Sequence, residues 1–155
     1  MRFMFIASAL FVVSAGCARP SLDLNAVPSR VDPAAASAVA GMWSGMVYES
    51  EADPGTPFTL VQVRQNDGTL GGQLAFTGSS SPLVDLKVLE ASGDHYVAIV
   101  GPFTNSRDSV QIVARLEGQL VGHTMSGTVY SRSINGGKAY KGRFKAERSR
   151  DVSGM

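Results

Sequence analysis

The sequence predicts an all-β protein in which a single antiparallel meander of about eight strands closes into a small barrel. Apolar and polar residues alternate with a period of two in short segments after residue 40, as in half-buried strands. Most segments are joined by hairpin-length turns rich in Gly, Asn and Asp. Beyond the first 16 residues no 3.6-residue apolar repeat is sustained, so no helix is expected to cover a sheet.

Closure is expected because a flat eight-stranded sheet has surfaces that must be covered. Such a sheet would leave two strand edges and one apolar face exposed, whereas a barrel removes both. Glycines inside the segments fit a barrel, since strongly coiled strands need places to bend. A two-sheet sandwich is the alternative architecture.

The chain divides into four expected parts. Residues 1–16 form a signal peptide, because a short basic start precedes an uncharged apolar stretch over Phe3–Val13, which is too short to span a membrane. Residues 17–38 form a Pro/Ala-rich tether, for which a terminal strand or helix packed on the domain is the alternative. Residues 39–148 form the barrel, and residues 149–155 form a disordered tail.

Four strands are expected in the first half of the domain. They are Gly41–Tyr48, Phe58–Gln65, Leu70–Thr77 and Val84–Val88. Asn66-Asp67-Gly68 marks a hairpin, because Asp-Gly supplies the positive φ angles of a tight turn. On the third strand Leu74 and Phe76 share the inward face.

Four further strands are expected in the second half. They are His95–Val100, Val110–Leu116, Leu120–Tyr130 and Tyr140–Glu147. Gly101–Arg107 is read as a loop, Glu117-Gly118-Gln119 as a turn and Asn135-Gly136-Gly137 as a hairpin turn. Gly122 and Gly127 indicate bulges or sharp coiling in the seventh strand.

The residues before the only cysteine bear on localisation. Ser14-Ala15-Gly16-Cys17 resembles the lipobox of bacterial lipoproteins, whose signal peptidase cuts before the cysteine. The resemblance implies a diacylglyceryl thioether on Cys17 that anchors the chain in the lipid bilayer. Because Ala18 rather than Asp follows, that family's sorting rule implies the outer membrane, with the domain facing the periplasm. Ser14 stands where Leu is usual, so ordinary cleavage with a free thiol is the alternative, as are inner-membrane retention and secretion.

Gly41-Met42-Trp43 resembles the start of the first strand in the calycin superfamily, which comprises lipocalins, fatty-acid-binding proteins and avidins. In these barrels the tryptophan of a Gly-x-Trp plugs one end. The resemblance implies a carrier or sensor of a small apolar ligand. The inward apolar residues that we expect to line its cavity are Trp43, Leu74, Phe76, Ile99, Ile112 and Phe144. Bulky inward side chains favour a filled interior instead, whereas Gly72, Gly142 and Ala114 would leave room, so both remain open.

Basic residues concentrate at the C-terminus. They suggest a contact surface for an anionic envelope component, such as lipid head groups, or for an acidic partner protein. The residues of this expected surface are Lys138, Lys141, Arg143, Lys145 and Arg148. A solvated outer face that prevents edge aggregation is the alternative. Nucleic acid is not an expected partner, because no exposed aromatics are interleaved with these charges.

Residue types that support catalysis are sparse. His95 and His123 lack partners at metal-binding spacing, and no Gly-x-Ser-x-Gly motif occurs. We therefore expect a binding protein rather than an enzyme, with no metal and no cofactor. The expected partners are the bilayer through acylated Cys17 and either a small apolar ligand or an envelope protein.

Overall fold

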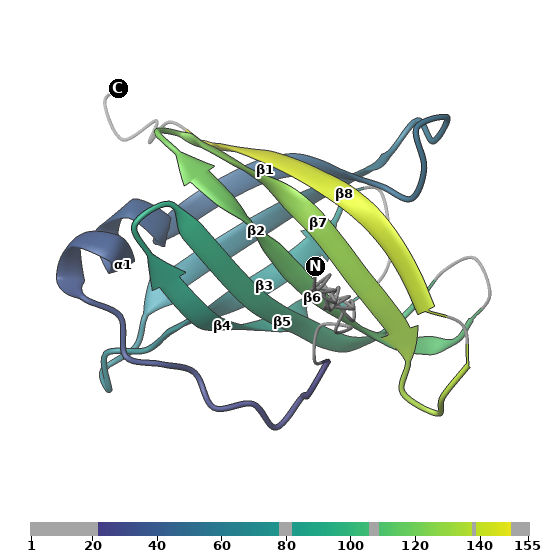
Figure 1. The fold of residues 1–155 in the computed structure, drawn as a ribbon, viewed down its shortest axis with the longest axis horizontal. Helices are drawn as coiled ribbons and strands as arrows, with labels where there is room; N and C mark the ends of the chain where they lie inside the picture. Colours follow the sequence, from purple (N-terminus) through teal and green to yellow (C-terminus); the bar gives the residue numbers. More distant parts are fainter. Residues whose placement is uncertain (1–21, 78–81, 106–108, 138, 150–155) are drawn as a thin grey trace, which may run out of the picture.

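Within the residues that the structure describes, which are 22–77, 82–105, 109–137 and 139–149 of a computed structural model, one short helix precedes eight strands (Figure 1). The helix is α1 (Pro33–Val39). The strands are β1 (Gly41–Tyr48), β2 (Thr56–Arg64), β3 (Leu70–Phe76), β4 (Val84–Ser92), β5 (His95–Thr104), β6 (Gln111–Val121), β7 (Thr124–Ser133) and β8 (Ala139–Arg148).

The strands form a closed antiparallel barrel in sequence order. Each strand pairs with its neighbours along the chain, and β1 pairs with β8 through a register that includes Val47↔Phe144 and Gly45↔Ala146. Closure leaves none of these strands with an unpaired edge. The predicted eight-stranded meander barrel is therefore confirmed, and the sandwich alternative is excluded.

The two ends of the barrel differ. At one end lie α1 and the short turns β2–β3, β4–β5 and β6–β7, and we call this the closed end (Figure 1). At the other end lie the longer connections β1–β2, β3–β4, β5–β6 and β7–β8, and we call this the mouth. The β2–β3 turn is held by Asp67, whose Oδ1 accepts bonds from the Thr69 hydroxyl (2.7 Å) and backbone N–H (2.9 Å). These bonds lower the pKa of Asp67.

The segment before β1 packs on the barrel, which differs from the free tether expected over residues 17–38. Asp32 caps α1 by accepting bonds from the N–H groups of Ala34 and Ala35 at 2.9 and 3.0 Å. Pro33 occupies the first turn, where a proline favours a helix start instead of breaking the helix. Ala36 and Val39 are buried in the core. The alternative of a packed terminal helix therefore describes residues 33–39.

Alternation along the strands places the core as predicted in the first half of the domain. The inward residues of β3 and β4 are buried together, namely Leu70, Leu74, Val84, Leu86 and Val88. A register shift between Val88 and Glu90 then brings Ala91 into the core. These buried side chains belong to one hydrophobic cluster that includes α1.

The boundaries of β5, β6 and β7 differ from those that the sequence predicts. The turn predicted at Glu117-Gly118-Gln119 is wrong, because β6 continues to Val121 and the chain reverses at Gly122, with a φ of 59°. Gly118 pairs with Gly127, and a Cβ on Gly127 would overlap the Gly118 backbone. The uninterrupted β6–β7 register shows that Gly127 serves close coiling and not a bulge. Part of the expected loop Gly101–Arg107 belongs to β5, after a register shift between Val100 and Phe103.

Candidate functional site

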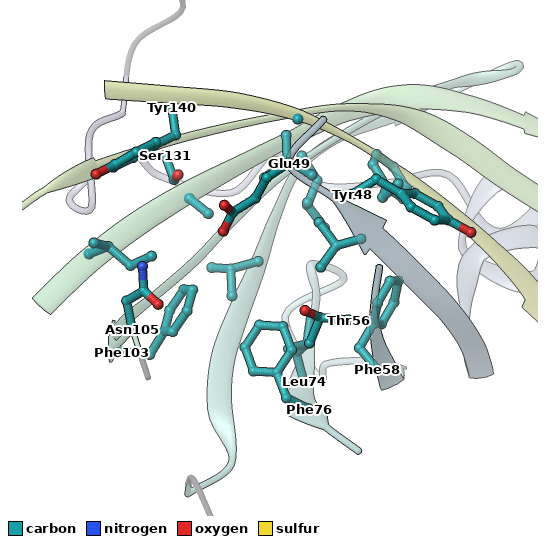
Figure 2. Close-up of a pocket in the computed structure, with 18 of the residues that line it drawn as sticks. Tyr48, Glu49, Thr56, Phe58, Leu74, Phe76, Phe103, Asn105, Ser131 and Tyr140 are labelled. Carbon is teal, nitrogen blue, oxygen red and sulfur yellow. The ribbon is translucent and has the colours of Figure 1, made fainter. Parts of the chain in front are cut away.

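A cavity of about 220 Å³ lies inside the barrel next to the mouth (Figure 2). Every strand except β4 contributes to its wall. The inner wall is apolar. Its large side chains are Phe58, Leu74, Phe76, Val100, Phe103, Ile112, Leu116 and Phe144. An eight-stranded barrel is just wide enough to be filled by side chains or to hold one small ligand, so small residues decide between the two.

Two small residues leave the space open. Ala114 lines the cavity where a longer side chain would project into it, and Gly142 lines it without any side chain. A Cβ on Gly142 would overlap the carbonyl oxygen of Tyr48, because the backbones of β8 and β1 approach closely there. The rings of Phe76 and Phe103 meet on another wall with centroids 5.5 Å apart and a 43° angle between their planes. These aromatic contacts define the shape of the apolar wall.

Polar groups gather at the opening of the cavity. Figure 2 shows the Glu49 side chain reaching over the opening, with Ser131 and Asn105 to one side and Thr56 to the other. Tyr140 lies at the outer margin of the same opening. The site is therefore apolar inside and polar at the mouth, which suits an amphipathic molecule whose polar end stays at the opening.

The structure brings together four of the six predicted lining residues, Leu74, Phe76, Ile112 and Phe144. Ile99 does not line the cavity, because it alternates to the outer face between Lys87 and Arg115. The nearly continuous apolar run of β5 hid this alternation, since Val97 and Ile99 are buried on the outer face while Tyr96, Ala98 and Val100 belong to the core.

Trp43 also lies away from the cavity, at the closed end. Its fully buried indole donates a hydrogen bond from Nε1 to the carbonyl of Val39 (2.8 Å). The Arg148 guanidinium stacks over the indole and donates bonds to the carbonyls of Ser37 (3.1 Å) and Ala40. Trp43 thus closes an end of the barrel instead of lining a ligand site. Arg148 is likewise not part of the surface expected to contact anions.

Three other basic residues of that surface lie near an acidic or aromatic side chain of the same domain. Arg143 Nη2 lies 3.8 Å from Glu51 Oε1, and Lys145 Nζ lies 3.6 Å from Glu147 Oε1. Lys141 Nζ lies 5.6 Å from the ring centre of Tyr130. These side chains are largely exposed, so each pairing contributes little to stability. Lys138 and Cys17 lie outside the described residues.

A buried polar pair lies in the core and was not anticipated from the sequence. The Tyr96 hydroxyl donates to Gln62 Oε1 at 2.7 Å, and both residues are at most 1% exposed. Burial raises the pKa of Tyr96, because the phenolate would lose its hydration. Gln62 continues the inward alternation of Phe58 and Leu60, which is the sequence signal that would have identified it. Neither residue lines the cavity, so we assign the pair a structural role.

In the described part of the chain, no group of three or more His, Cys, Asp or Glu side chains could hold a metal ion. No helix in the same ranges is long and apolar enough to cross a membrane. Comparison of the chain with protein-family models, with curated proteins and with solved structures finds no match.

Proposed function

We propose that this chain is a membrane-anchored binding protein that carries or senses a small apolar ligand inside its barrel. The observation that carries the proposal is the cavity of about 220 Å³ at the mouth, with apolar walls and a polar opening. The calycin resemblance at Gly41–Trp43 supports the same reading, because it implies a ligand-binding barrel.

The size of the cavity narrows the ligand class. Apolar cavities of roughly 150 Å³ hold a benzene molecule, and drug-sized ligands occupy roughly 300–1,000 Å³. A cavity of about 220 Å³ lies between these sizes and therefore suits a slender group better than a drug-sized molecule. We propose a single acyl chain, with its polar end beside Ser131 and Thr56 at the opening.

Anchoring is the second part of the proposal. The support for it is the lipobox resemblance at Ser14–Cys17 and the absence of any other cysteine from the sequence. We propose acylation of Cys17 and placement at the outer membrane, with the barrel in the periplasm. Intact-mass spectrometry of the protein purified from membranes should show acyl groups on Cys17, and Cys17→Ser should release the chain. A free thiol on membrane-derived protein would exclude the anchor.

Ligand binding is tested by blocking the cavity. Ala114→Phe places a ring inside the cavity, whereas Ala75→Phe is a matched control because Ala75 alternates to the outer face of β3. Native mass spectrometry of the wild type from its own host should show bound lipid, and a fluorescent fatty acid should bind the emptied protein. Ala114→Phe should lose both signals and Ala75→Phe should keep them. Equal binding by the two variants would exclude the cavity as the site.

A contact surface on β8 is the alternative function. The observation that favours it is the alignment of Lys141, Arg143 and Lys145 on the outer face of one strand. Such a row of charges would attract an anionic envelope component or an acidic protein. Replacing all three by Glu should abolish co-purification of the partner while the bound lipid remains. Unchanged co-purification would count against this alternative.

A further inference from the structure

We propose that the mouth of the barrel faces the lipid bilayer, so that the cavity receives its acyl chain directly from the membrane. This inference rests on the proposed function, because it assumes that the membrane is attached through Cys17. It adds an orientation and a source for the ligand. Two observations carry it: the path of the chain before α1 and the exposed tyrosine at the cavity opening.

The chain before α1 runs along the barrel wall from the closed end toward the mouth. The N–H of Val31 donates to the carbonyl of Gly68 (3.1 Å) in the β2–β3 turn at the closed end. The N–H of Ser29 donates to the carbonyl of Leu89 (3.3 Å) on β4, and Lys87 Nζ donates to the carbonyl of Leu24 (3.1 Å). Because β4 runs from the mouth at Val84 toward the closed end, the order Leu89, Lys87 leads toward the mouth.

Figure 1 shows this purple segment passing beneath β4, away from α1 and toward the loops of the mouth. Cys17 is separated from Leu22 by five peptide links, which span at most about 18 Å. Cys17 is therefore joined to the barrel wall through these five links, and the whole stretch of residues 17–38 does not act as a free tether. A bilayer that holds Cys17 lies within this reach of Leu22, at the end of a segment whose contacts lead toward the mouth.

Large apolar side chains are exposed around the mouth. Leu83 before β4, Ile134 after β7 and Tyr140 at the start of β8 are 60%, 42% and 40% exposed. Leu83 and Ile134 come from two of the connections at the mouth, and Tyr140 lines the cavity opening. The closed end exposes comparable residues, Met42, Val63 and Val121 at 50%, 47% and 69%, so exposure by itself does not set the orientation. Tyr140 distinguishes the mouth, because it lies at the cavity opening and tyrosine is enriched at membrane interfaces.

Two of the acidic groups near the mouth are engaged within the protein. The Asp53 carboxylate accepts bonds from the N–H of Glu49 (2.8 Å) and of Gly55 (3.0 Å), and Glu51 pairs with Arg143 at 3.8 Å. These contacts hold the β1–β2 connection beside the opening. We therefore choose a zwitterionic bilayer as the probe surface, since its head groups carry no net charge to repel this connection.

The orientation is tested with one added tryptophan at each end of the barrel. The chain from Cys17 onward is coupled through its only thiol to a maleimide-bearing lipid in phosphatidylcholine vesicles with brominated acyl chains, which quench nearby tryptophans. Leu83→Trp lies at the mouth, and Val121→Trp, at a position 69% exposed beside the β6–β7 turn, is the matched control. The buried Trp43 contributes the same background to both variants, and the wild type measures it.

Bromination should remove a large part of the added emission of Leu83→Trp and none of that of Val121→Trp. Stronger quenching of Val121→Trp, equal quenching of both or quenching of neither would overturn the proposed orientation. Because the coupling is chemical, the result does not depend on whether Cys17 is acylated in the cell. Failure of the anchor would appear in the intact mass, and failure of ligand binding in the native mass spectrum.

Delivery from the membrane is tested by reversing the barrel. Cys17→Ser combined with Val121→Cys attaches the closed end to the vesicle and turns the mouth toward water. Loading of a fluorescent fatty acid from the vesicle should be several-fold faster in the chain coupled through Cys17 than in the reversed chain. Equal loading rates would show that the mouth does not draw its ligand from the bilayer.

Discussion

The guanidinium carbon of Arg148 lies 5.7 Å from the ring centre of Trp43, and this pair joins both ends of the barrel meander to α1. Trp43 stands near the start of β1 and Arg148 at the end of β8, in register with each other. Gly41, with a φ of 126°, makes room for the arginine, because a Cβ there would lie 3.1 Å from Nε and Nη2 of Arg148. Packing of Arg148 at the closed end therefore explains why Gly41 and Trp43 occur together in this barrel.

Replacing Arg148 by Met should destabilise the fold. The variant loses charge-assisted bonds to two backbone carbonyls and the stacking on Trp43, which together correspond to about 2–4 kcal/mol of unfolding free energy. Lys145→Met is the matched control, since that exposed side chain pairs with Glu147 at 3.6 Å on the surface and the change should alter stability by less than about 0.5 kcal/mol. Urea unfolding measures both, and equal midpoints would show that Arg148 does not secure the closed end.

The role of Arg148 illustrates what the sequence could and could not predict. Phe144, Ala146 and Arg148 share one side of β8, so alternation alone assigns the arginine inward. Its charge suggested a surface role instead, and only the contact with Trp43 resolves the conflict. By contrast, the number, order and pairing of the strands followed from alternation and turn residues, because both signals are local.

The cavity could be predicted only in part, because its wall depends on register between distant strands. Leu74 and Phe144 were placed correctly by alternation within their own strands. Ile99 was not, because both faces of β5 are buried and the sequence shows no alternation there. The opening itself, with Glu49 and Asn105, comes from connections whose conformation has no periodic signal.

The buried pair of Tyr96 and Gln62 predicts a large coupling in a double-mutant cycle. Tyr96→Phe leaves the Gln62 carbonyl without its bond, and Gln62→Met leaves the Tyr96 hydroxyl unpaired, so each should cost about 1–3 kcal/mol. The double variant should be close to the wild type, because it removes both polar partners and also the Gln62 Nε2 that has no partner. Additive losses in chemical denaturation would exclude the coupling.

Tyr96 also predicts loss of stability at alkaline pH. Its folded-state pKa lies above the unfolded value of about 10, so the unfolded chain releases a proton that the folded chain keeps. The contribution of Tyr96 to the unfolding free energy is complete below pH about 10 and declines above that pH by about 1.4 kcal/mol per pH unit. The difference in unfolding free energy between the wild type and Tyr96→Phe should therefore shrink as the pH rises above about 10. A pH-independent difference would show that Tyr96 ionises as freely in the folded protein as in the unfolded chain.

Close approach of β6 and β7 predicts that Gly127 tolerates no side chain. An alanine Cβ would overlap the carbonyl oxygen of Glu117 and the Cα of Gly118, which are backbone atoms that cannot rotate away. Gly127→Ala should therefore cost about 3 kcal/mol of unfolding free energy by forcing the strands apart. Gly122→Ala is the matched control, because that turn glycine has a φ of 59° and open space around it, so only backbone strain of about 1 kcal/mol is expected. Urea unfolding compares the two variants, and a smaller loss for Gly127→Ala than for Gly122→Ala would show that the strands separate easily at this point.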